Sequence, residues 1–225
     1  MTTTLDNLPD VQVGASTSLD QWERPDPEIR NRFSRIPTAN IGDAMHRLGV
    51  VASGIKPVWP GSALVGAAYT VWTRPGDNLG IHEAMRRAEP GDVLVINGGG
   101  DESRALIGEL MGGRAKSLGI VGFIIDGAIR DASGLAEYEM PVFARAATGA
   151  GPYKFGPYAL QTPVALGGVV VNPGDVVVAD ADGVVIVPLA QANLVADRAE
   201  AKQADELRIR QGVDNDINAS PYRER

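Results

Sequence analysis

The chain contains no cysteine and only two histidines among its 225 residues. Without cysteine it has no disulfide, no thiolate metal ligand and no cysteine nucleophile. Two histidines leave little scope for a zinc site built from several imidazoles. Any bound metal is therefore expected to be a hard cation held by carboxylates and water, such as Mg²⁺ or Mn²⁺.

An excess of positive charge and long apolar runs are also missing. The 28 acidic residues outnumber 21 lysines and arginines, which gives a formal net charge of −7. Nucleic-acid binding needs a surplus of cations facing the phosphates, so this charge argues against nucleic acid as the main partner. No apolar stretch approaches the roughly 20 residues of a membrane span, and the N-terminus has no signal-peptide pattern. These features predict a cytoplasmic protein that does not enter a membrane.

The composition divides the chain into three parts. Residues 1–25 are polar and punctuated by Pro and Asp, which predicts an N-terminal arm. Residues 26–188 alternate β-branched runs with amphipathic stretches, and they are expected to form a single catalytic domain. Residues 189–225 are predicted to be a C-terminal helix and tail, because Leu189–Gly212 is rich in Ala, Glu, Lys, Gln and Arg.

Strands and helices are expected to alternate along the middle part. Short runs dense in β-branched residues predict strands at Ala63–Thr73, Asp92–Asn97, Ile120–Asp126, Pro141–Ala147, Val169–Val171, Val176–Ala179 and Gly183–Val187. Helices are expected at Pro27–Arg35, Ile41–Leu48, Asn78–Ala88 and within Ser103–Leu118. The strand–helix–strand order from Asp92 to Asp126 predicts a right-handed βαβ unit with parallel strands, whereas the later hairpins are expected to be antiparallel. The expected fold class is therefore α/β, with mixed sheets flanked by helices.

Three glycines directly follow the expected strand at Asp92–Asn97. Gly98–Gly100 would let the backbone approach a ligand closely, and the N–H groups of the next helix could then bind an anion. The segment lacks the Lys-Ser/Thr ending of a P-loop and the spaced glycines of a dinucleotide-binding turn, so neither nucleotide class is supported. A flexible loop without a ligand is the alternative.

An Arg-Asp pair, Arg130 and Asp131, follows the apolar run that ends at Asp126. The end of a buried strand is where α/β proteins place their ligand chemistry. Asp131 could instead cap the short helix after it, and Arg130 could pair with a surface carboxylate. Asp126 is expected to order the turn that presents Arg130.

A third candidate is Glu109, expected in the first turn of a helix that begins near Gly108. The backbone N–H groups of Leu110 and Met111 would be unpaired donors there. Because the Gly-rich segment and the Arg-Asp pair follow neighbouring parallel strands, Glu109 and Asp131 could face one crevice. Two carboxylates, an arginine and free N–H groups suit a hydrated Mg²⁺ or Mn²⁺ chelated by a 2-oxo acid. A solvated carboxylate that interacts only with the helix dipole is the alternative for Glu109.

Taken together, these motifs resemble a known family. Twenty residues separate Glu109, in Gly108–Met111, from Arg130-Asp131, in IDGAIRD. This combination is similar to the RraA-like family, whose enzymatic members are class II, metal-dependent 4-hydroxy-4-methyl-2-oxoglutarate and 4-carboxy-4-hydroxy-2-oxoadipate aldolases. The resemblance covers roughly residues 36–188 and includes IPTANIGDAMHRLG, PGDNLGIHEAMRRAEPGDVLVINGGG, ARAATGAGPYKFGP and PVALGGVVVNPGDVVVADADGVVIVP.

The resemblance implies a swivelling β/β/α fold and a homotrimer or hexamer with sites at subunit interfaces. It implies that Asp131 is a metal ligand, that Glu109 acts on the metal through bound water, and that Arg130 binds the substrate and steadies its enolate. Residues Gly108, Glu109, Leu110 and Met111 match the segment whose backbone N–H groups take the carboxylate of the 2-oxo acid.

The family's aldolases also borrow a glutamate from the C-terminal helix of a neighbouring subunit. Glu206 is the best match for that residue, and Asp205 and Glu200 are the alternatives. Three other residues are expected to have no catalytic role. Lys154 lies in a Gly/Pro loop without the apolar shield that would make it a Schiff-base lysine, while His46 and His82 are expected to pack on helices or at interfaces.

The expected function is a metal-dependent aldolase that cleaves a 4-hydroxy-2-oxo diacid to pyruvate and a second 2-oxo acid. Oxaloacetate decarboxylation is expected as a side activity, because both reactions leave the enolate of pyruvate. The alternative is a non-catalytic regulator that binds and inhibits a ribonuclease, as other members of the resembling family do. A related lyase or isomerase acting on a sugar acid is a third possibility.

Overall fold

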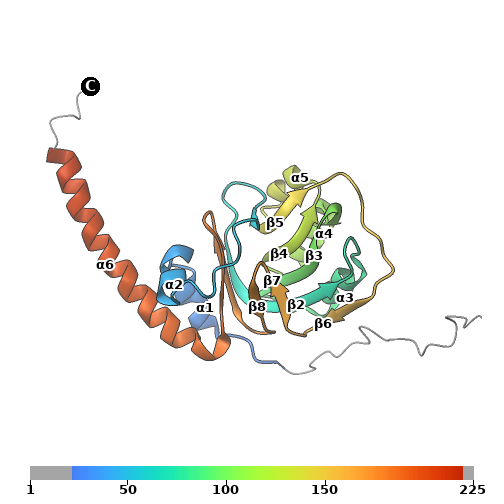
Figure 1. Ribbon diagram of the computed structural model, residues 1–225, viewed down its shortest axis with the longest axis horizontal. Helices are drawn as coiled ribbons and strands as arrows, with labels where there is room; N and C mark the ends of the chain where they lie inside the picture. The colour runs from blue at the N-terminus through green and yellow to red at the C-terminus, as the bar shows by residue number, and fades with distance from the viewer. Residues whose placement is uncertain (1–21, 220–225) are drawn as a thin grey trace, which may run out of the picture.

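An eight-stranded mixed sheet organises the chain, of which the computed structural model describes residues 22–219 (Figure 1). The strand order is β1-β5-β4-β3-β2-β9-β10, and β6 pairs with β2 outside this path. The parallel centre consists of β2 (Leu64–Thr73), β3 (Asp92–Ile107), β4 (Gly122–Ile129) and β5 (Val142–Ala147). The antiparallel strands are β1 (Lys56–Pro57), β6 (Tyr158–Leu160), β9 (Val176–Asp180) and β10 (Gly183–Val187). A separate two-stranded sheet pairs β7 (Val164–Leu166) with β8 (Val169–Val171).

Helices flank the sheet, so the α/β class with mixed sheets is confirmed. They are α1 (Pro27–Phe33), α2 (Thr38–Ala44), α3 (Leu79–Arg87), α4 (Glu109–Ser117), α5 (Ala132–Glu137) and α6 (Ala192–Ala219). The C-terminal helix runs further than the expected Gly212. Its first turns bury Val195, Ala196 and Ala199 against α1 and α2, and its second half projects away from the body (Figure 1).

The first half of β3 and the whole of β4 are buried on both faces. Leu94, Ile96, Phe123 and Ile125 pack in one core cluster, while their neighbours Val93, Val95 and Ile124 pack in another. Side chains alternate along a strand, so a continuous apolar run fills both clusters. The parallel pairing of β3 with β4 confirms the predicted orientation of these strands.

β3 is much longer than its sequence pattern predicted. It continues through the Gly-rich segment to Ile107, and its register against β4 shifts between Asn97 and Asp101 and again before Ala105. The prediction of a loop leading directly into a helix was therefore wrong. Gly99 and Gly100 have φ angles of 70° and 72°, which glycine adopts at little cost, so the strand bulges here instead of ending. The run Val169–Val171 is antiparallel, as expected of the later hairpins, but its partner is β7 and not the neighbouring run Val176–Asp180.

The first described residues are attached to the body. Arg24 donates two hydrogen bonds to the fully buried carboxylate of Asp92, from Nε at 3.0 Å and from Nη2 at 3.1 Å. Its guanidinium also lies 4.0 Å from the centre of the Trp22 ring, which contacts Tyr69 edge to face. The end of the expected N-terminal arm is therefore bound to the start of β3, while residues 1–21 lie outside the described part.

Candidate functional site

The carboxyl ends of β3 and β4 bring together the residues that the sequence singled out. Gly108 directly follows β3, and Arg130 and Asp131 directly follow β4. Ile107 lies opposite Ile129 in the parallel ladder, and the Arg130 N–H donates to the Ile107 carbonyl at 3.0 Å. Both turns therefore lie at one edge of the sheet, where open α/β sheets bind ligands.

Gly108 is the point at which these side chains meet. A Cβ on Gly108 would overlap Asp131 Oδ2 and would lie 3.2 Å from Arg130 Nε. The Asp131 carboxylate and the Arg130 side chain therefore both lie directly against the Gly108 backbone. Arg130 Nε is 3.4 Å from Asp131 Oδ2, and 45% and 41% of the two side chains are exposed, so both reach solvent.

The backbone of Asp131 is left-handed, with φ 56° and ψ 44°. It occupies the N-cap position of α5, but its side chain forms no capping hydrogen bond. The capping role considered for Asp131 is thus not what its carboxylate performs. A non-glycine residue in this region costs free energy, and such residues often occur at functional sites. The carboxylate is left available to a ligand.

Glu109 is the first residue of α4 and is half-buried. Its carboxylate lies against Gly134 in α5, where a Cβ would overlap it. Because the side chain packs on α5, it is not the freely solvated carboxylate of the alternative interpretation. The carboxylates of Glu109 and Asp131 therefore both lie at the adjoining first turns of α4 and α5.

The start of α4 offers backbone donors, but not at every predicted position. Within the described chain, the N–H groups of Glu109 and Leu110 form no hydrogen bond, as expected for a first helical turn. Met111 differs from the prediction, because its N–H donates to the Gly108 carbonyl at 3.1 Å. The Leu110 side chain is 77% exposed. The available anion-binding donors are therefore those of Glu109 and Leu110.

Asp126 does not order the turn before Arg130, contrary to expectation. It lies inside β4, is largely buried, and forms an ion pair with Arg145 of β5. This contact is non-local, because Arg145 belongs to the next parallel strand. The ion pair packs against the Gly-rich bulge of β3, because both side chains lie next to Gly100.

The C-terminal helix α6 lies away from this edge in its own chain (Figure 1). Glu206 accepts a hydrogen bond from Asn40 Nδ2 at 2.6 Å and lies 3.8 Å from Lys202 Nζ. Glu200 is paired with Arg32, whose hydrogen bonds lower the pKa of Glu200. Asp205 is 3.1 Å from Arg208. The structure of a single chain thus brings none of these carboxylates to Asp131.

Lys154 is exposed between β5 and β6, in the loop where it was expected. His46 differs from the expectation that it packs on a helix, because α2 ends at Ala44 and His46 is exposed in the turn after it. His82 is half-buried in α3, where desolvation lowers its pKa and favours the neutral imidazole. No further carboxylate joins Asp131 and Glu109, since residues 22–219 contain no group of three metal-ligating side chains.

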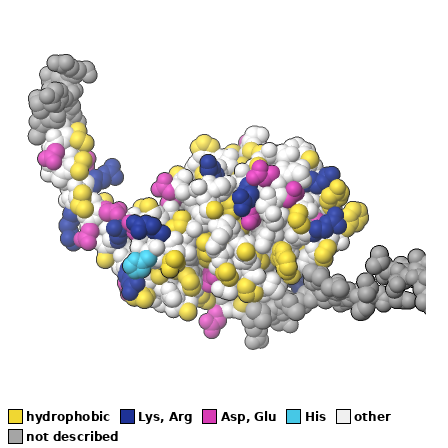
Figure 2. Space-filling view, in the orientation of Figure 1, with side chains coloured by type: hydrophobic (Ala, Val, Ile, Leu, Met, Phe, Trp, Pro, Cys, Tyr) yellow, Lys and Arg dark blue, Asp and Glu magenta, His cyan; other side chains and the backbone are white. Residues whose placement is uncertain are grey.

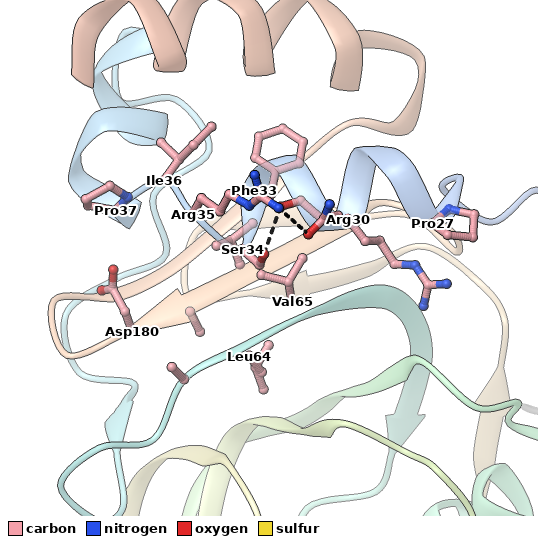
Figure 3. A pocket seen from close by; sticks show the side chains of 14 residues that line it. Pro27, Arg30, Phe33, Ser34, Arg35, Ile36, Pro37, Leu64, Val65 and Asp180 are labelled. Carbon is pink, nitrogen blue, oxygen red and sulfur yellow. Dashed lines mark hydrogen bonds between the residues drawn. The ribbon is translucent and has the colours of Figure 1, made fainter. Parts of the chain in front are cut away.

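The cavity in Figure 3 is separate from this site. It has a volume of about 630 Å³ and lies between α1 and the strands β2 and β9. Its lining is mostly apolar, and its carboxylate, Asp180, already accepts hydrogen bonds from Thr38 N at 2.9 Å and Thr38 Oγ1 at 2.6 Å. None of the predicted site residues lines it, so the edge around Gly108 remains the candidate site.

One wall of the site was missed by sequence reasoning. Gly151 lies beside the Arg130 guanidinium, and Arg104 binds the Gly151 carbonyl. Arg104 lies in the bulged part of β3, which the sequence had assigned to a loop or helix. No periodicity signals such a contact, because it joins residues 47 positions apart.

Comparison with known proteins is consistent with this geometry. A family model described as "RraA-like: Aldolase/RraA" matches residues 38–186. A protein of Halalkalibacterium halodurans is 43% identical over 195 residues, covering 86% of this chain and 93% of its own length, and is named "Putative 4-hydroxy-4-methyl-2-oxoglutarate aldolase". A protein of Deinococcus radiodurans with the same name is 33% identical, covering 66% of this chain and 92% of its own.

Solved structures agree on the fold. An uncharacterised protein from Pseudomonas syringae has a TM-score of 0.79 at 28% identity, covering 86% of this chain and 96% of its own. Streptomyces coelicolor RraAS2, described as an unusual member of the RNase ES inhibitor RraA protein family, has a TM-score of 0.75 at 30% identity, covering 84% of this chain and 99% of its own.

None of the helices within residues 22–219 is long and apolar enough to cross a bilayer. With a family model matched over residues 38–186 and a relative 43% identical over 86% of the chain, this protein belongs to the RraA-like family.

Proposed function

We propose that the chain is a divalent-metal-dependent aldolase that cleaves a 4-hydroxy-2-oxo diacid of the 4-hydroxy-4-methyl-2-oxoglutarate type into pyruvate and a second 2-oxo acid. The observation that carries the proposal is the meeting of Asp131, Arg130 and the first turn of α4 around Gly108. The names of the relatives in Halalkalibacterium and Deinococcus support the same reaction class. Oxaloacetate decarboxylation is proposed as a side activity, because it leaves the same enolate.

Two groups of this chain would bind the reacting 2-oxo acid. The unpaired N–H groups of Glu109 and Leu110 point out of a helix N-terminus, where the helix dipole also favours an anion, so they suit the substrate carboxylate. Arg130 presents a planar, permanently charged guanidinium beside them. It would stabilise the oxyanion that develops as the carbon–carbon bond breaks.

The residues present fit a hard divalent cation. Asp131 supplies a carboxylate free of capping bonds, and Glu109 supplies a second across the α4–α5 junction. Mg²⁺ keeps several water ligands and needs only one or two carboxylates, so Asp131 would bind it directly and Glu109 through water. When bound, Mg²⁺ or Mn²⁺ would act as a Lewis acid on the oxygens of the 2-oxo acid.

Pyruvate release is the measurement that tests this function. The protein is expected to form pyruvate from 4-hydroxy-4-methyl-2-oxoglutarate and from oxaloacetate, to lose both activities after exhaustive chelation, and to regain them with Mg²⁺ or Mn²⁺. Turnover that survives chelation would contradict the class II mechanism. It would direct attention to Lys154 as a Schiff-base residue.

A regulator that binds a ribonuclease is the second candidate function. It is favoured by the structural similarity to RraAS2 and to a Thermus protein described as the RNA-processing inhibitor RraA, which has a TM-score of 0.63. The Glu109, Arg130 and Asp131 set disfavours it, because inhibition by surface contact needs no such site. Inhibition of a ribonuclease by a protein that releases no pyruvate would establish the alternative.

A closed homo-oligomer, a trimer or hexamer, is also proposed. The projecting half of α6 carries exposed apolar side chains (Figure 2), among them Ile209 (67%), Val213 (49%) and Ile217 (53%). Their spacing of four residues places them on one helix face, which the described chain leaves uncovered. A second copy would bury this face and bring Glu206 to the site of its neighbour.

Light scattering combined with activity assays tests the assembly. The expected mass in solution is three or six times 23.7 kDa. Val213→Asp is expected to dissociate the oligomer, because it places a charge in the centre of the apolar face. A fully active monomer would refute the assembly and would remove Glu206 from the site.

A further inference from the structure

The segment from Gly149 to Gly156, called the wall segment below, joins β5 to β6 and passes beside the candidate site. A Cβ on Gly151 would lie 3.5 Å from Arg130 Nη1, which is ordinary van der Waals contact. The backbone of the wall segment thus lies directly next to the Arg130 guanidinium. Any displacement of Gly151 changes the space in which that guanidinium is held.

Arg104 binds the wall segment at two points. Its Nη1 donates to the Gly151 carbonyl at 2.9 Å, and its guanidinium lies 4.1 Å from the centre of the Tyr153 ring. Next to it on β3, the Ala105 N–H donates to the Ala150 carbonyl at 2.8 Å. The planar arginine head can donate and stack at once, which a lysine cannot do.

The far half of the wall segment is held without Arg104. The Tyr153 N–H donates to the Gly76 carbonyl at 2.8 Å, and the Tyr153 carbonyl accepts from Asn78 N at 3.0 Å. The buried Asp77 carboxylate accepts from Phe155 N at 2.7 Å and from Gly156 N at 3.0 Å. Loss of Arg104 would therefore loosen the half that contacts Arg130 while the other half stays anchored.

We propose that Arg104 is a positioning residue that keeps the Arg130 guanidinium in its reactive place by clamping Gly151 and Tyr153. Arg104 acts through the wall segment, not by touching the reacting atoms. The expected effect of Arg104 on turnover rests on the proposed aldolase function. The expected effect of Arg104 on the position of Arg130 does not, so experiments can refute either one without the other.

The first experiment follows Arg130 itself in the full-length protein. The Nε–Hε resonance of Arg130, assigned by its loss in Arg130→Lys, is expected to shift and broaden in Arg104→Ala. Amide hydrogen exchange is expected to rise at Ala150, at Gly151 and at Ala105, whose N–H donates to the Ala150 carbonyl, and to stay unchanged at Tyr153 and in β4. Arg86→Ala, which removes an exposed surface arginine, is the matched control and should alter neither measurement.

The second experiment is kinetic and uses the ring of Tyr153. Arg104→Ala is expected to lower kcat for pyruvate formation by about 10²-fold, the scale of a misplaced catalytic group, with a melting temperature near that of the wild type. Added guanidinium ion should restore part of kcat by filling the space that the Arg104 side chain leaves.

Variants of Tyr153 test the stacking contact. Tyr153→Phe keeps the stacked ring and should behave as wild type, whereas Tyr153→Leu should lower kcat, as Arg104→Ala does.

The outcomes separate the two proposals. An unchanged Arg130 resonance and unchanged exchange in Arg104→Ala would overturn the positioning role, whatever the activity. A perturbed resonance with wild-type kcat in an active enzyme would also overturn it, because the position of Arg130 would then not matter. A wild-type protein that forms no pyruvate would refute the aldolase, while a perturbed Arg130 resonance would still support the clamp.

Discussion

Replacing Arg130 by Ala is expected to lower the turnover of pyruvate formation by around 10²–10³-fold, the effect of losing one preorganised oxyanion donor. The fold should survive, because Arg130 is nearly half exposed and its ion pair with Asp131, at 3.4 Å, joins two exposed side chains. Steady-state kcat and melting temperature, measured side by side, check both parts. The expected result is a stable protein that binds substrate but turns it over slowly.

Variants at the neighbouring position distinguish the roles within the pair. Arg130→Lys should recover only part of the turnover, since a point charge does not reproduce the guanidinium fork. Asp131→Asn should weaken metal binding, so excess Mg²⁺ should partly rescue it and should leave Arg130→Ala unchanged. Near wild-type turnover in folded Arg130→Ala would contradict the assignment. A parallel loss of melting temperature and activity in Arg130→Ala and Asp131→Asn would also contradict it, because each substitution would then merely break a turn.

Replacing Asp92 by Ala is expected to destabilise the fold by about 2–3 kcal/mol, because it removes a buried, charged acceptor of hydrogen bonds while Arg24 stays partly solvated. Asp92 is fully buried at the start of β3, and its carboxylate binds Arg24 twice and accepts the Glu89 N–H at 2.8 Å. The loss should lower the melting temperature by on the order of 10 °C for a chain of this size. Thermal unfolding followed by circular dichroism measures it.

The matched control is the exposed partner of the same arginine. Glu89 lies 3.2 Å from Arg24 Nη1, but 63% of its side chain is exposed. Glu89→Ala should therefore cost no more than about 1 kcal/mol. Equal effects of the two substitutions would show that burial of Asp92 contributes nothing to the strength of the contact.

Several elements of the site follow from local pattern alone. The apolar runs of β3 and β4 predict buried parallel strands, because only a strand with both faces covered is apolar at every position. Parallel neighbours place their carboxyl ends at one edge, so the sequence already brings Gly108 and Glu109 near Arg130 and Asp131. The helix start near Gly108 was likewise expected from the sequence, and the long C-terminal helix reflects its composition.

Local sequence patterns therefore specify which residues reach the carboxyl edge of the sheet. How those residues are held there depends on the packing of distant segments. The bulge that carries Arg104, the ion pair of Asp126 with Arg145, and the left-handed backbone of Asp131 depend on partners from other strands. Such contacts have no period or local propensity, because their free energy arises only when distant segments pack together. For the same reason, the contact between Gly151 and Arg130 is identified only in the folded chain.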